Sequence, residues 1–419
     1  MEKMMDLAMK PECWNNFFTF KKEHRLLSTK ELNEMQDFVD EKRYLSCVES
    51  WKNHTFPSTL PLRRSINKMG SGKKRVVYSY QGDEGLFLKF IAFNLFRYDY
   101  LFSSNCYAFR RSIGVKDAIM RLRLTPDLSK KHCLKIDISN YFNSIDVNLL
   151  LGKLSFLQED DLALYELFER ILKNDKVADS HSKDDGKSGN LKIIPDKCHG
   201  VMAGTPTSAF FANLYLARVD QFFENAGILY FRYSDDILFF ADTREELFTY
   251  REVLYDMISK LGLSVNPDKV KVSTPGEEFE FLGFSYRDGR IDLSPATIRK
   301  MKSKIKRKAD ALRRWQRKKG LTPDKAAIGL IKAMNHKFYG NPENDTDSND
   351  FTWSRWFFPN LNTDKGLKEI DTYFQEYIRY TVTGRHYKGN YRISYEQLKE
   401  WGYKSLVHEY YEAQKNGNV

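Results

Sequence analysis

Two adjacent acids, Asp235 and Asp236, interrupt an apolar and aromatic segment at residues 228–241. Branched and aromatic residues on both sides predict two short strands, and residues 234–236 predict a tight turn between them. An unpaired carboxylate is costly to bury, so acids at the tip of an apolar hairpin indicate that a positive partner binds there. A divalent metal ion is the expected partner. An isolated Asp-Asp turn is more often only solvated, so the rest of the chain decides between the two interpretations.

A third acid, Asp137, is expected late in a strand within residues 133–146, just before a turn. An acid at a strand end beside an acidic hairpin can complete a shared carboxylate cage. Phosphoryl transfer by two metal ions about 4 Å apart requires such a cage, which activates a hydroxyl and stabilises the leaving group. The expected cofactor is therefore two Mg²⁺ ions, with Mn²⁺ as the alternative.

The composition is that of a folded, multidomain protein. The chain has 419 residues, of which 42% are hydrophobic and 14% aromatic, enough for two or three cores. No apolar run approaches the roughly 20 residues of a membrane span, and we expect neither a signal peptide nor a membrane partner. The five cysteines are scattered without zinc or redox spacing, which favours reduced thiols and a cytoplasmic location.

Positive charge is concentrated in one segment. Residues 299–319 hold twelve Lys or Arg and one acid, so this segment alone accounts for the net charge of +11. Met301, Ile305, Leu312 and Trp315 form an apolar stripe that predicts a helix. A solvated helix face is the ordinary alternative, but charge of one sign at this density favours a polyanionic partner, namely nucleic acid. The candidate nucleic-acid ligands here are Arg299, Lys302, Lys306, Arg313, Arg314 and Arg317.

These patterns predict an α/β (α+β) fold in which an antiparallel sheet with helices carries the chemistry and a helical region follows. Residues 174–197 are polar and predict a loop. The tail segment 392–411 is amphipathic and rich in Tyr, which indicates helix packing more than RNA stacking. The predicted parts are a helical extension (1–60), mixed strands and helices (61–131), the catalytic part (132–290), the basic helical part (291–339) and a helical tail (340–419).

Seven segments together resemble the motifs of reverse transcriptases, in that family's order. Asp137 with Phe142 resembles the first catalytic motif, and Tyr233–Asp236 resembles the Tyr-x-Asp-Asp motif. The other five are similar to a basic fingers strand (Lys68 and 72–75), the bacterial Tyr-Gly-Phe-Arg signature (104–111), a Gly-rich loop and helix (199–216), a lysine motif (262–269) and a primer-grip hairpin (281–284).

The resemblance implies a right-hand polymerase with fingers (61–131), palm (132–290) and thumb (291–339). It implies that Asp137 and Asp235 ligate both metal ions, with Asp236 supporting the site. It also implies an RNA template, dNTP substrates and a DNA product. Lys269 is the expected proton donor to pyrophosphate, although a surface role is the alternative and Lys271 competes for the function.

The same resemblance assigns nucleotide contacts. Phe142 is expected to crowd a 2′-hydroxyl and so select dNTPs, and Tyr233 to contact the primer or nucleotide. Lys68 and Arg75 are expected to hold the triphosphate. The alternative for Phe142 and Tyr233 is ordinary packing in the core, and the alternative for Lys68 and Arg75 is an exposed strand edge. Two further expected contacts are Gly204, which permits close approach of the backbone to the nucleotide, and Arg110, which is expected to bind nucleic acid.

The chain departs from the family pattern in the Gly-rich loop. Where the family usually has Pro-Gln-Gly, this chain has Met202, Ala203 and Gly204, and its Ser208 is followed by Ala209 in place of Pro. The side-chain amide that would contact template or nucleotide is therefore missing at Ala203. This departure puts ordinary primer–template handling in doubt.

Among bacterial branches, the chain most resembles the antiphage defence-associated reverse transcriptases, which are related to retron and group II intron enzymes. That branch implies a cognate non-coding RNA as the template. Two alternatives remain at this point: template-independent or protein-primed DNA synthesis, and a non-catalytic RNA-binding scaffold.

Overall fold

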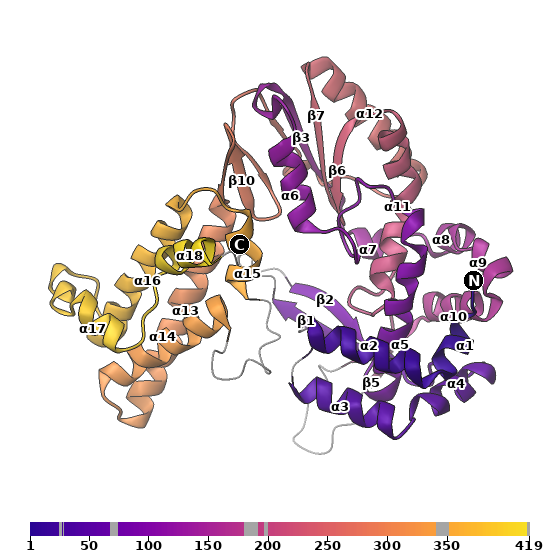
Figure 1. Cartoon of the computed structure of the whole chain (residues 1–419), viewed down its shortest axis with the longest axis horizontal. Coiled ribbons are helices and arrows are strands. Elements are labelled where there is room, and N and C mark those ends of the chain that lie inside the picture. Colours follow the sequence, from indigo (N-terminus) through magenta and orange to yellow (C-terminus); the bar gives the residue numbers. More distant parts are fainter. Residues whose placement is uncertain are drawn as a thin grey trace. The chain divides into compact units, whose positions relative to one another are not determined.

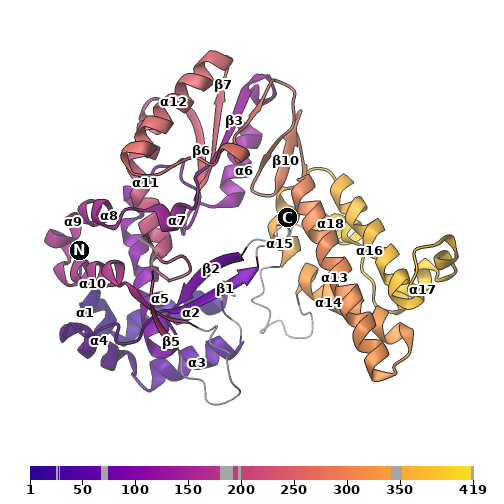
Figure 2. The same ribbon diagram turned by 180° about the vertical axis from the view of Figure 1, so that it is seen from behind.

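The computed structural model describes residues 1–24, 27, 29–67, 74–179, 192–196, 200–340 and 352–416. Its contacts divide the chain into two units, Met1–Pro275 and Gly276–Val419. The boundary falls within the expected catalytic part, 132–290, and the five-part division by function stays a prediction. The first unit holds two four-stranded sheets, and the second holds a three-stranded sheet followed by helices (Figures 1 and 2).

The N-terminal residues are helical, as expected, and pack on the apolar helix α5. Trp14 stacks on Phe90 of α5 with ring centroids 3.9 Å apart, and both side chains are fully buried. The aromatic face of the extension therefore forms core. The elements are α1 (Met4–Met9), α2 (Pro11–Glu23), α3 (Thr29–Asp40), α4 (Tyr44–Lys52), α5 (Gly82–Asn94) and the 3-10 helix η1 (Leu95–Leu101).

The first sheet has the strand order β2-β1-β4-β5. Its strands are β1 (Leu62–Asn67), β2 (Lys74–Ser79), β4 (Lys176–Asp179) and β5 (Lys192–Pro195). The prediction of a loop over 174–197 was wrong at its two ends, which form β4 and β5. Strand β4 pairs in parallel with β1, and Val177 is fully buried, so burial of a few apolar residues outweighs the polar composition.

The second sheet, here called the acid-bearing sheet, has the order β6-β7-β3-β8 with antiparallel pairs throughout. Helix α12 (Arg244–Lys260) packs against β7 and β3, and α11 (Ser208–Asn225) packs against β6 (Figure 1). Residues Ile237–Ala241 are all buried, which explains the continuous apolar run. The strands are β3 (His132–Asp137), β6 (Leu229–Tyr233), β7 (Asp236–Ala241) and β8 (Lys271–Ser273).

Short helices complete the first unit. They are α6 (Val115–Leu124), α7 (Tyr141–Ser144), α8 (Val147–Lys153), α9 (Phe156–Asp160) and α10 (Leu162–Lys173), with the 3-10 helices η2 (Leu128–Lys130) and η3 (Pro267–Lys269).

The basic segment of the second unit forms one helix, α13 (Pro295–Lys319). Ser294 caps its first turn, Pro295 occupies the first helical position, and Gly320 ends it in the left-handed conformation. Trp315 is 45% exposed, so its predicted place in the apolar stripe was wrong. The buried stripe consists of Ile298, Met301, Ile305 and Ala309.

The tail of the second unit packs around one buried acid, Asp371, on α16 (Lys365–Thr383). Its carboxylate accepts hydrogen bonds from Tyr403, Ser405 and the backbone of Leu406. This supports packing as the role of the tail. The other elements are β9 (Phe279–Phe281), β10 (Phe284–Arg287), β11 (Arg290–Leu293), α14 (Pro323–Tyr339), α15 (Trp353–Phe357), α17 (Tyr395–Glu400), α18 (Leu406–Lys415), η4 (Phe358–Asn360) and η5 (Lys388–Arg392).

The predicted fold class is confirmed: sheets in which most strand pairs are antiparallel, with helices, precede a helical C-terminal region. Among the described residues, none of the helices combines the length and apolar character needed to cross a membrane.

Candidate active site

Strands β6 and β7 form the predicted acidic hairpin. Tyr233 pairs directly with Asp236, and Ser234 and Asp235 make the turn between them. Ser234 is buried and has a φ of 59°, a left-handed conformation that is uncommon for residues other than glycine. The turn is therefore held in an unusual backbone geometry beside the two acids.

Asp137 ends β3, the strand next to β7, and lies directly opposite Asp236 in the antiparallel register. The backbone N–H of Ile138 donates to the carbonyl oxygen of Asp235 at 3.0 Å, which extends the pairing into the turn. Side chains of directly opposed residues share one face of a sheet, so this register brings the acids together. Sequence reasoning predicted the three acids, and the structure places Asp137 opposite Asp236 with Asp235 in the adjoining turn.

The environment opposes ionisation of both hairpin acids. Burial raises the pKa of Asp235, and repulsion from Asp236 and Asp137 raises it further. Burial also raises the pKa of Asp236, where Lys135 acts in the opposite direction and Asp137 adds to the increase. Like charges held together out of water favour the binding of a cation.

Two lysines provide positive charge at this site. Lys269 places its Nζ 2.5 Å from Oδ2 of Asp137, so the predicted proton donor is an ion-pair partner of a predicted metal ligand. Lys135 places its Nζ 3.6 Å from Oδ1 of Asp236. Sequence reasoning missed Lys135, although its position two residues before Asp137 on one strand puts both side chains on the same face.

A buried polar network lies beneath the hairpin. Arg232 and Asp220, both fully buried, form a bidentate ion pair with distances of 2.7 and 2.5 Å. The Nη1 atom of Arg232 also donates to the carbonyl oxygen of Ser234 at 3.1 Å. Tyr230 donates to Asp220 at 2.8 Å. The network therefore supports the turn from the side opposite the solvent, and sequence reasoning missed it.

The Gly-rich loop packs on the backbone of Phe142. The N–H of Val201 donates to the carbonyl oxygen of Phe142 at 2.8 Å, and a Cβ on Gly200 would lie only 2.2 Å from that oxygen. Only glycine fits this position.

The next part of the same loop joins strand β2. The N–H of Tyr78 donates to the carbonyl oxygen of Ala203 at 2.9 Å, and Ala203 is buried. Gly204 is exposed, has a φ of 103°, and would place a Cβ 2.9 Å from the carbonyl oxygen of Tyr78. The loop is thus clamped between Phe142 and the first sheet.

Three aromatic rings lie beside the acids. Phe142, on α7 five residues after Asp137, is half-buried and pairs edge-on with Phe109 at 6.4 Å between ring centroids. Tyr233, which precedes the turn, lies 6.3 Å from the same Phe109 ring. The structure therefore brings the predicted nucleotide contacts Phe142 and Tyr233 together through a residue that sequence reasoning did not single out.

The predicted triphosphate ligands lie on the first sheet. Arg75 is exposed on β2 and pairs in register with Ile66 of β1. Lys68 lies outside the described residues. The assignment of both as phosphate ligands stays a prediction.

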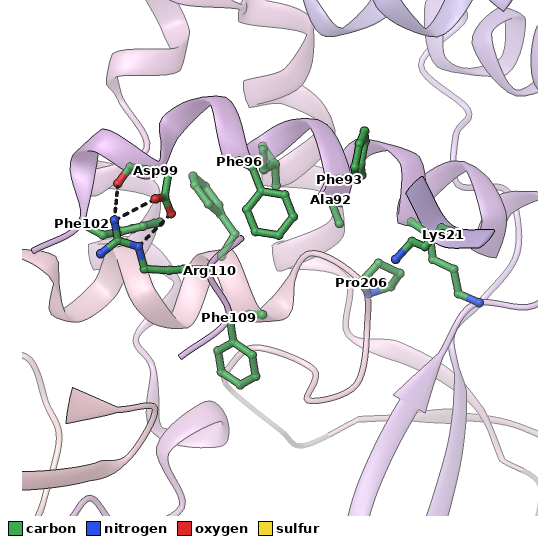
Figure 3. Close-up of a pocket in the computed structure, with 13 residues that line it drawn as sticks. Lys21, Ala92, Phe93, Phe96, Asp99, Phe102, Phe109, Arg110 and Pro206 are labelled. Carbon is green, nitrogen blue, oxygen red and sulfur yellow. Dashed lines mark hydrogen bonds and ion pairs between the residues drawn. The ribbon is translucent and has the colours of Figure 1, made fainter. Parts of the chain in front are cut away.

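Arg110 makes five hydrogen bonds inside the protein. Two of them reach the carboxylate of Asp99 at 2.9 and 2.8 Å, and a third reaches the backbone carbonyl oxygen of Asp99 (Figure 3). The other two reach the backbone carbonyl oxygens of Ser103 and Cys106. Five bonds match the five N–H groups of a guanidinium. This geometry favours a structural role for Arg110 over the predicted contact with nucleic acid, because no donor is left to reach a phosphate.

The predicted cations of α13 divide into two groups. Lys302 pairs with Glu369 at 2.7 Å, and Arg313 lies over the ring of Tyr380 at 4.6 Å, so both pack on α16. The other four are exposed: Arg299, Lys306, Arg314 and Arg317.

Comparison with known proteins identifies the family to which the chain belongs. The family model described as "Reverse transcriptase (RNA-dependent DNA polymerase)" matches residues 66–286, more than half of the chain. The chain belongs to the reverse transcriptase family. The matched range contains Asp137, Asp235, Asp236 and Lys269.

Individual relatives of this reverse transcriptase are distant. The retron Ec86 reverse transcriptase of Escherichia coli is 21% identical over 185 residues, which are 43% of this chain and 50% of that protein. The chain therefore spans about half the length of this curated relative. Among solved structures, apo telomerase of Candida tropicalis is 13% identical, with 86% of this chain and 72% of that chain covered and a TM-score of 0.43. The telomerase of Candida albicans in complex with a fragment of telomeric RNA is 14% identical, with 90% and 68% covered and a TM-score of 0.42.

Reverse transcriptase domains generally use divalent metal ions, and the chemistry of Asp137, Asp235 and Asp236 fits that use. Carboxylate oxygens are the ligands that Mg²⁺ and Mn²⁺ prefer. In the described part of the chain, no three His, Cys, Asp or Glu side chains converge closely enough to hold a metal ion as they stand. Lys269 instead pairs with Asp137, and burial together with repulsion between the acids raises the pKa of both Asp235 and Asp236. The strand register fixes where the backbones of Asp137 and Asp236 lie, whereas carboxylate side chains can change rotamer to meet an ion.

Proposed function

We propose that this reverse transcriptase is an RNA-directed DNA polymerase that joins dNTPs by two-metal phosphoryl transfer. The observation that carries the proposal is the register of the acid-bearing sheet, which sets Asp137 opposite Asp236 and beside Asp235. Asp137 and Asp236 lie on paired strands, Asp235 lies in the turn between β6 and β7, and all three fall within the family match. Such carboxylates suit a reaction in which positioning and charge stabilisation do most of the catalysis.

Asp137 and Asp235 would hold two Mg²⁺ ions, or Mn²⁺ in their place, and Asp236 would support the site. When bound, these ions lower the pKa of the attacking 3′-hydroxyl and neutralise charge on the phosphates. Lys269 is proposed to protonate the leaving pyrophosphate. Its ammonium already lies at the site through its ion pair with Asp137.

Substrate binding is proposed for residues around these acids. Phe142 would crowd a 2′-hydroxyl, Tyr233 would contact the primer or nucleotide, and the exposed Gly204 would let the nucleotide approach the loop backbone. Arg75 and Lys68 would bind the triphosphate. The exposed cations of α13 would bind the RNA template or the DNA product.

The test is DNA synthesis by the purified protein with RNA, Mg²⁺ and dNTPs, compared with Asp235→Ala. A matched control is Asp242→Ala, which removes an acid that pairs with Lys131 just beyond the opposite end of β7. We expect synthesis by the wild type and the control and none by Asp235→Ala. Equal synthesis by Asp235→Ala would show that the metal site is wrongly assigned, and an absence of synthesis by the wild type would favour a non-catalytic scaffold.

The template is proposed to be a cognate non-coding RNA, with a role in antiphage defence in the bacterial cytoplasm. Support comes from the resemblance to that branch, from the similarity to a bacterial retron enzyme, and from the free thiols of the four described cysteines. Sequencing the RNA that co-purifies with the protein, together with its DNA product, tests the proposal. A random mixture of cellular RNA would contradict a cognate template.

Template-independent or protein-primed synthesis is the second candidate, and the loop at Ala203 favours it. Alanine has no side-chain amide to offer a template. Ala203 is also buried, and its carbonyl oxygen accepts a hydrogen bond from the N–H of Tyr78. DNA made from a single dNTP without RNA, or DNA linked covalently to the protein, would support this candidate. A product complementary to the bound RNA would rule it out.

A further inference from the structure

Phe109 combines two unfavourable features beside the candidate active site. Its φ is 56°, in the left-handed region, and its side chain is 44% exposed. A bulky side chain at positive φ is a true conformational outlier, and exposed aromatic surface gains little from burial. Strain of this kind persists only where the surroundings over-determine it, and it concentrates at functional sites.

The residues on both sides of Phe109 are held by hydrogen bonds, through the backbone before it and through the side chain of Arg110 after it. The carbonyl oxygen of Ala108 accepts from Nδ2 of the fully buried Asn213 at 2.7 Å, and Arg110 is held by its five bonds. The N–H of Tyr107 donates to the carbonyl oxygen of Arg232 at 2.9 Å, which ties the segment to the strand that carries Tyr233. Phe109 therefore cannot relax without breaking these contacts.

The fixed backbone directs the ring toward the active-site aromatics. Figure 3 shows the Phe109 ring pointing away from the helix that carries Phe96, whereas Arg110 reaches Asp99. The ring forms an edge-on pair with Phe142 at an interplanar angle of 75°, and it lies 6.3 Å from the ring of Tyr233. Both distances fall within the range of favourable aromatic pairs.

Phe142 needs such a support if its ring is to exclude a hydroxyl group. The Gly-rich loop fixes the backbone of Phe142, and its ring is only half-buried. A side chain that rejects a substrate by a clash must not rotate away, because a shift of 1 Å removes the clash. The Phe109 ring contacts Phe142 and is itself held by a backbone that cannot relax.

We infer that Phe109 is a positioning residue for sugar selection, which holds the Phe142 ring against the site of the nucleotide 2′-carbon. This inference rests on the proposed function and assigns the strained residue a part in dNTP specificity. Phe109 acts through Phe142 and is not itself assigned a contact with the reacting atoms.

The experiment compares kcat/KM for a dNTP and for the matching rNTP on one primer–template. Phe109→Gly removes the ring and also relieves the strain, since glycine accepts a positive φ at no cost. We expect its preference for dNTP over rNTP to fall about tenfold, with a melting temperature equal to or above that of the wild type. Phe109→Tyr keeps the ring and should retain the preference of the wild type.

Two further variants separate positioning from general damage. Phe222→Ala removes an equally exposed aromatic, 46% exposed on α11, and should leave the dNTP preference unchanged. Phe142→Ala should lower the preference at least as far as Phe109→Gly, and the double variant should show no further loss, because one residue acts through the other.

Three results would overturn the inference and leave the proposed function intact. The first is an unchanged dNTP preference in Phe109→Gly, and the second is an equal loss of kcat/KM with dNTP and rNTP. The third is additive effects of the two substitutions in the double variant. A wild type that makes no DNA would overturn the proposed function and this inference with it. The two failures are thus distinguishable in a single assay series.

Discussion

Arg232 and Asp220 form a bidentate ion pair in which neither side chain is exposed, and Arg232 also donates to the carbonyl oxygen of Ser234. The pair connects α11 to the strand that leads into the acidic turn. One guanidinium therefore supports both the core of the first unit and the backbone of the residue before Asp235.

Removing one partner of this pair should strongly destabilise the protein. Arg232→Met leaves Asp220 buried without its cation, and we expect the free energy of unfolding to fall by about 3–5 kcal/mol. Denaturant unfolding measures this change. The exposed pair of Lys260 and Asp256 is the control, because Lys260→Met should change stability by less than about 0.5 kcal/mol.

The double variant Arg232→Met/Asp220→Leu separates stability from positioning. Replacing both charges with apolar side chains should restore much of the lost stability. DNA synthesis should stay reduced, because the carbonyl oxygen of Ser234 still lacks its donor. Full activity in a stable double variant would contradict the support that we assign to Arg232.

Asp235→Asn should abolish DNA synthesis and make the folded protein more stable in metal-free buffer. Burial and repulsion from Asp236 and Asp137 raise the pKa of Asp235, so the ionised form is unfavourable in the folded state at neutral pH. A neutral amide of the same shape removes that penalty, and we expect a gain of about 0.5–2 kcal/mol. Unfolding in the presence of a chelator measures it, and a loss of stability would show that the acids do not repel one another as described.

Mg²⁺ should reverse this order of stability. A ligand that binds only the folded state raises the melting temperature with its concentration. We expect Mg²⁺ to raise the melting temperature of the wild type markedly and that of Asp235→Asn little. Equal shifts for the two proteins would place the metal outside this site.

The acids could be predicted from the sequence because their signal is local. Asp235 and Asp236 interrupt a strand pattern, and Asp137 lies at the end of another. Lys135 follows the same period-two rule and was within reach of sequence reasoning. The contact of Asp236 with Lys135 is thus an extension of the strand pattern.

Other features depend on tertiary packing and could not be predicted. Arg232 meets Asp220 only because α11 packs on β6, and Arg110 meets Asp99 through a turn that no periodic pattern marks. The hydrogen bonds that hold the segment around Phe109 join its neighbours Ala108 and Tyr107 to Asn213 and Arg232, which are distant in the sequence. Sequence therefore located the three acids that we propose as the catalytic groups, whereas the contacts that support them could be seen only in the structure.

Gly200→Ala should disrupt the loop that packs on Phe142. A Cβ at this position would lie 2.2 Å from a backbone carbonyl oxygen, so the loop must move. We expect a loss of about 1–3 kcal/mol in stability, as for overpacking elsewhere, and a large loss of DNA synthesis. Gly152→Ala on α8 is the control, because no atom lies within 4 Å of its Cβ and alanine favours a helix by about 0.5–1 kcal/mol. Normal synthesis by Gly200→Ala would show that the close packing at Phe142 is dispensable.

The exposed cations of α13 should control the salt dependence of RNA binding. We expect replacement of Arg299, Lys306, Arg314 and Arg317 by Gln to weaken binding and to flatten the plot of log affinity against log salt. Each phosphate contact with a single strand contributes a slope of about 0.7, so four lost contacts reduce it by roughly 3. Binding titrations at several salt concentrations measure this slope.

Lys302 and Arg313 supply the matched comparison on the same helix. Both carry the same charge as the exposed group but pack on α16, through Glu369 and Tyr380. Their replacement by Gln should lower stability and leave the salt slope nearly unchanged, since a cation engaged by the protein releases few counterions from RNA. If both sets changed the slope equally, binding would depend on net charge alone, and the exposed face of α13 would have no special role.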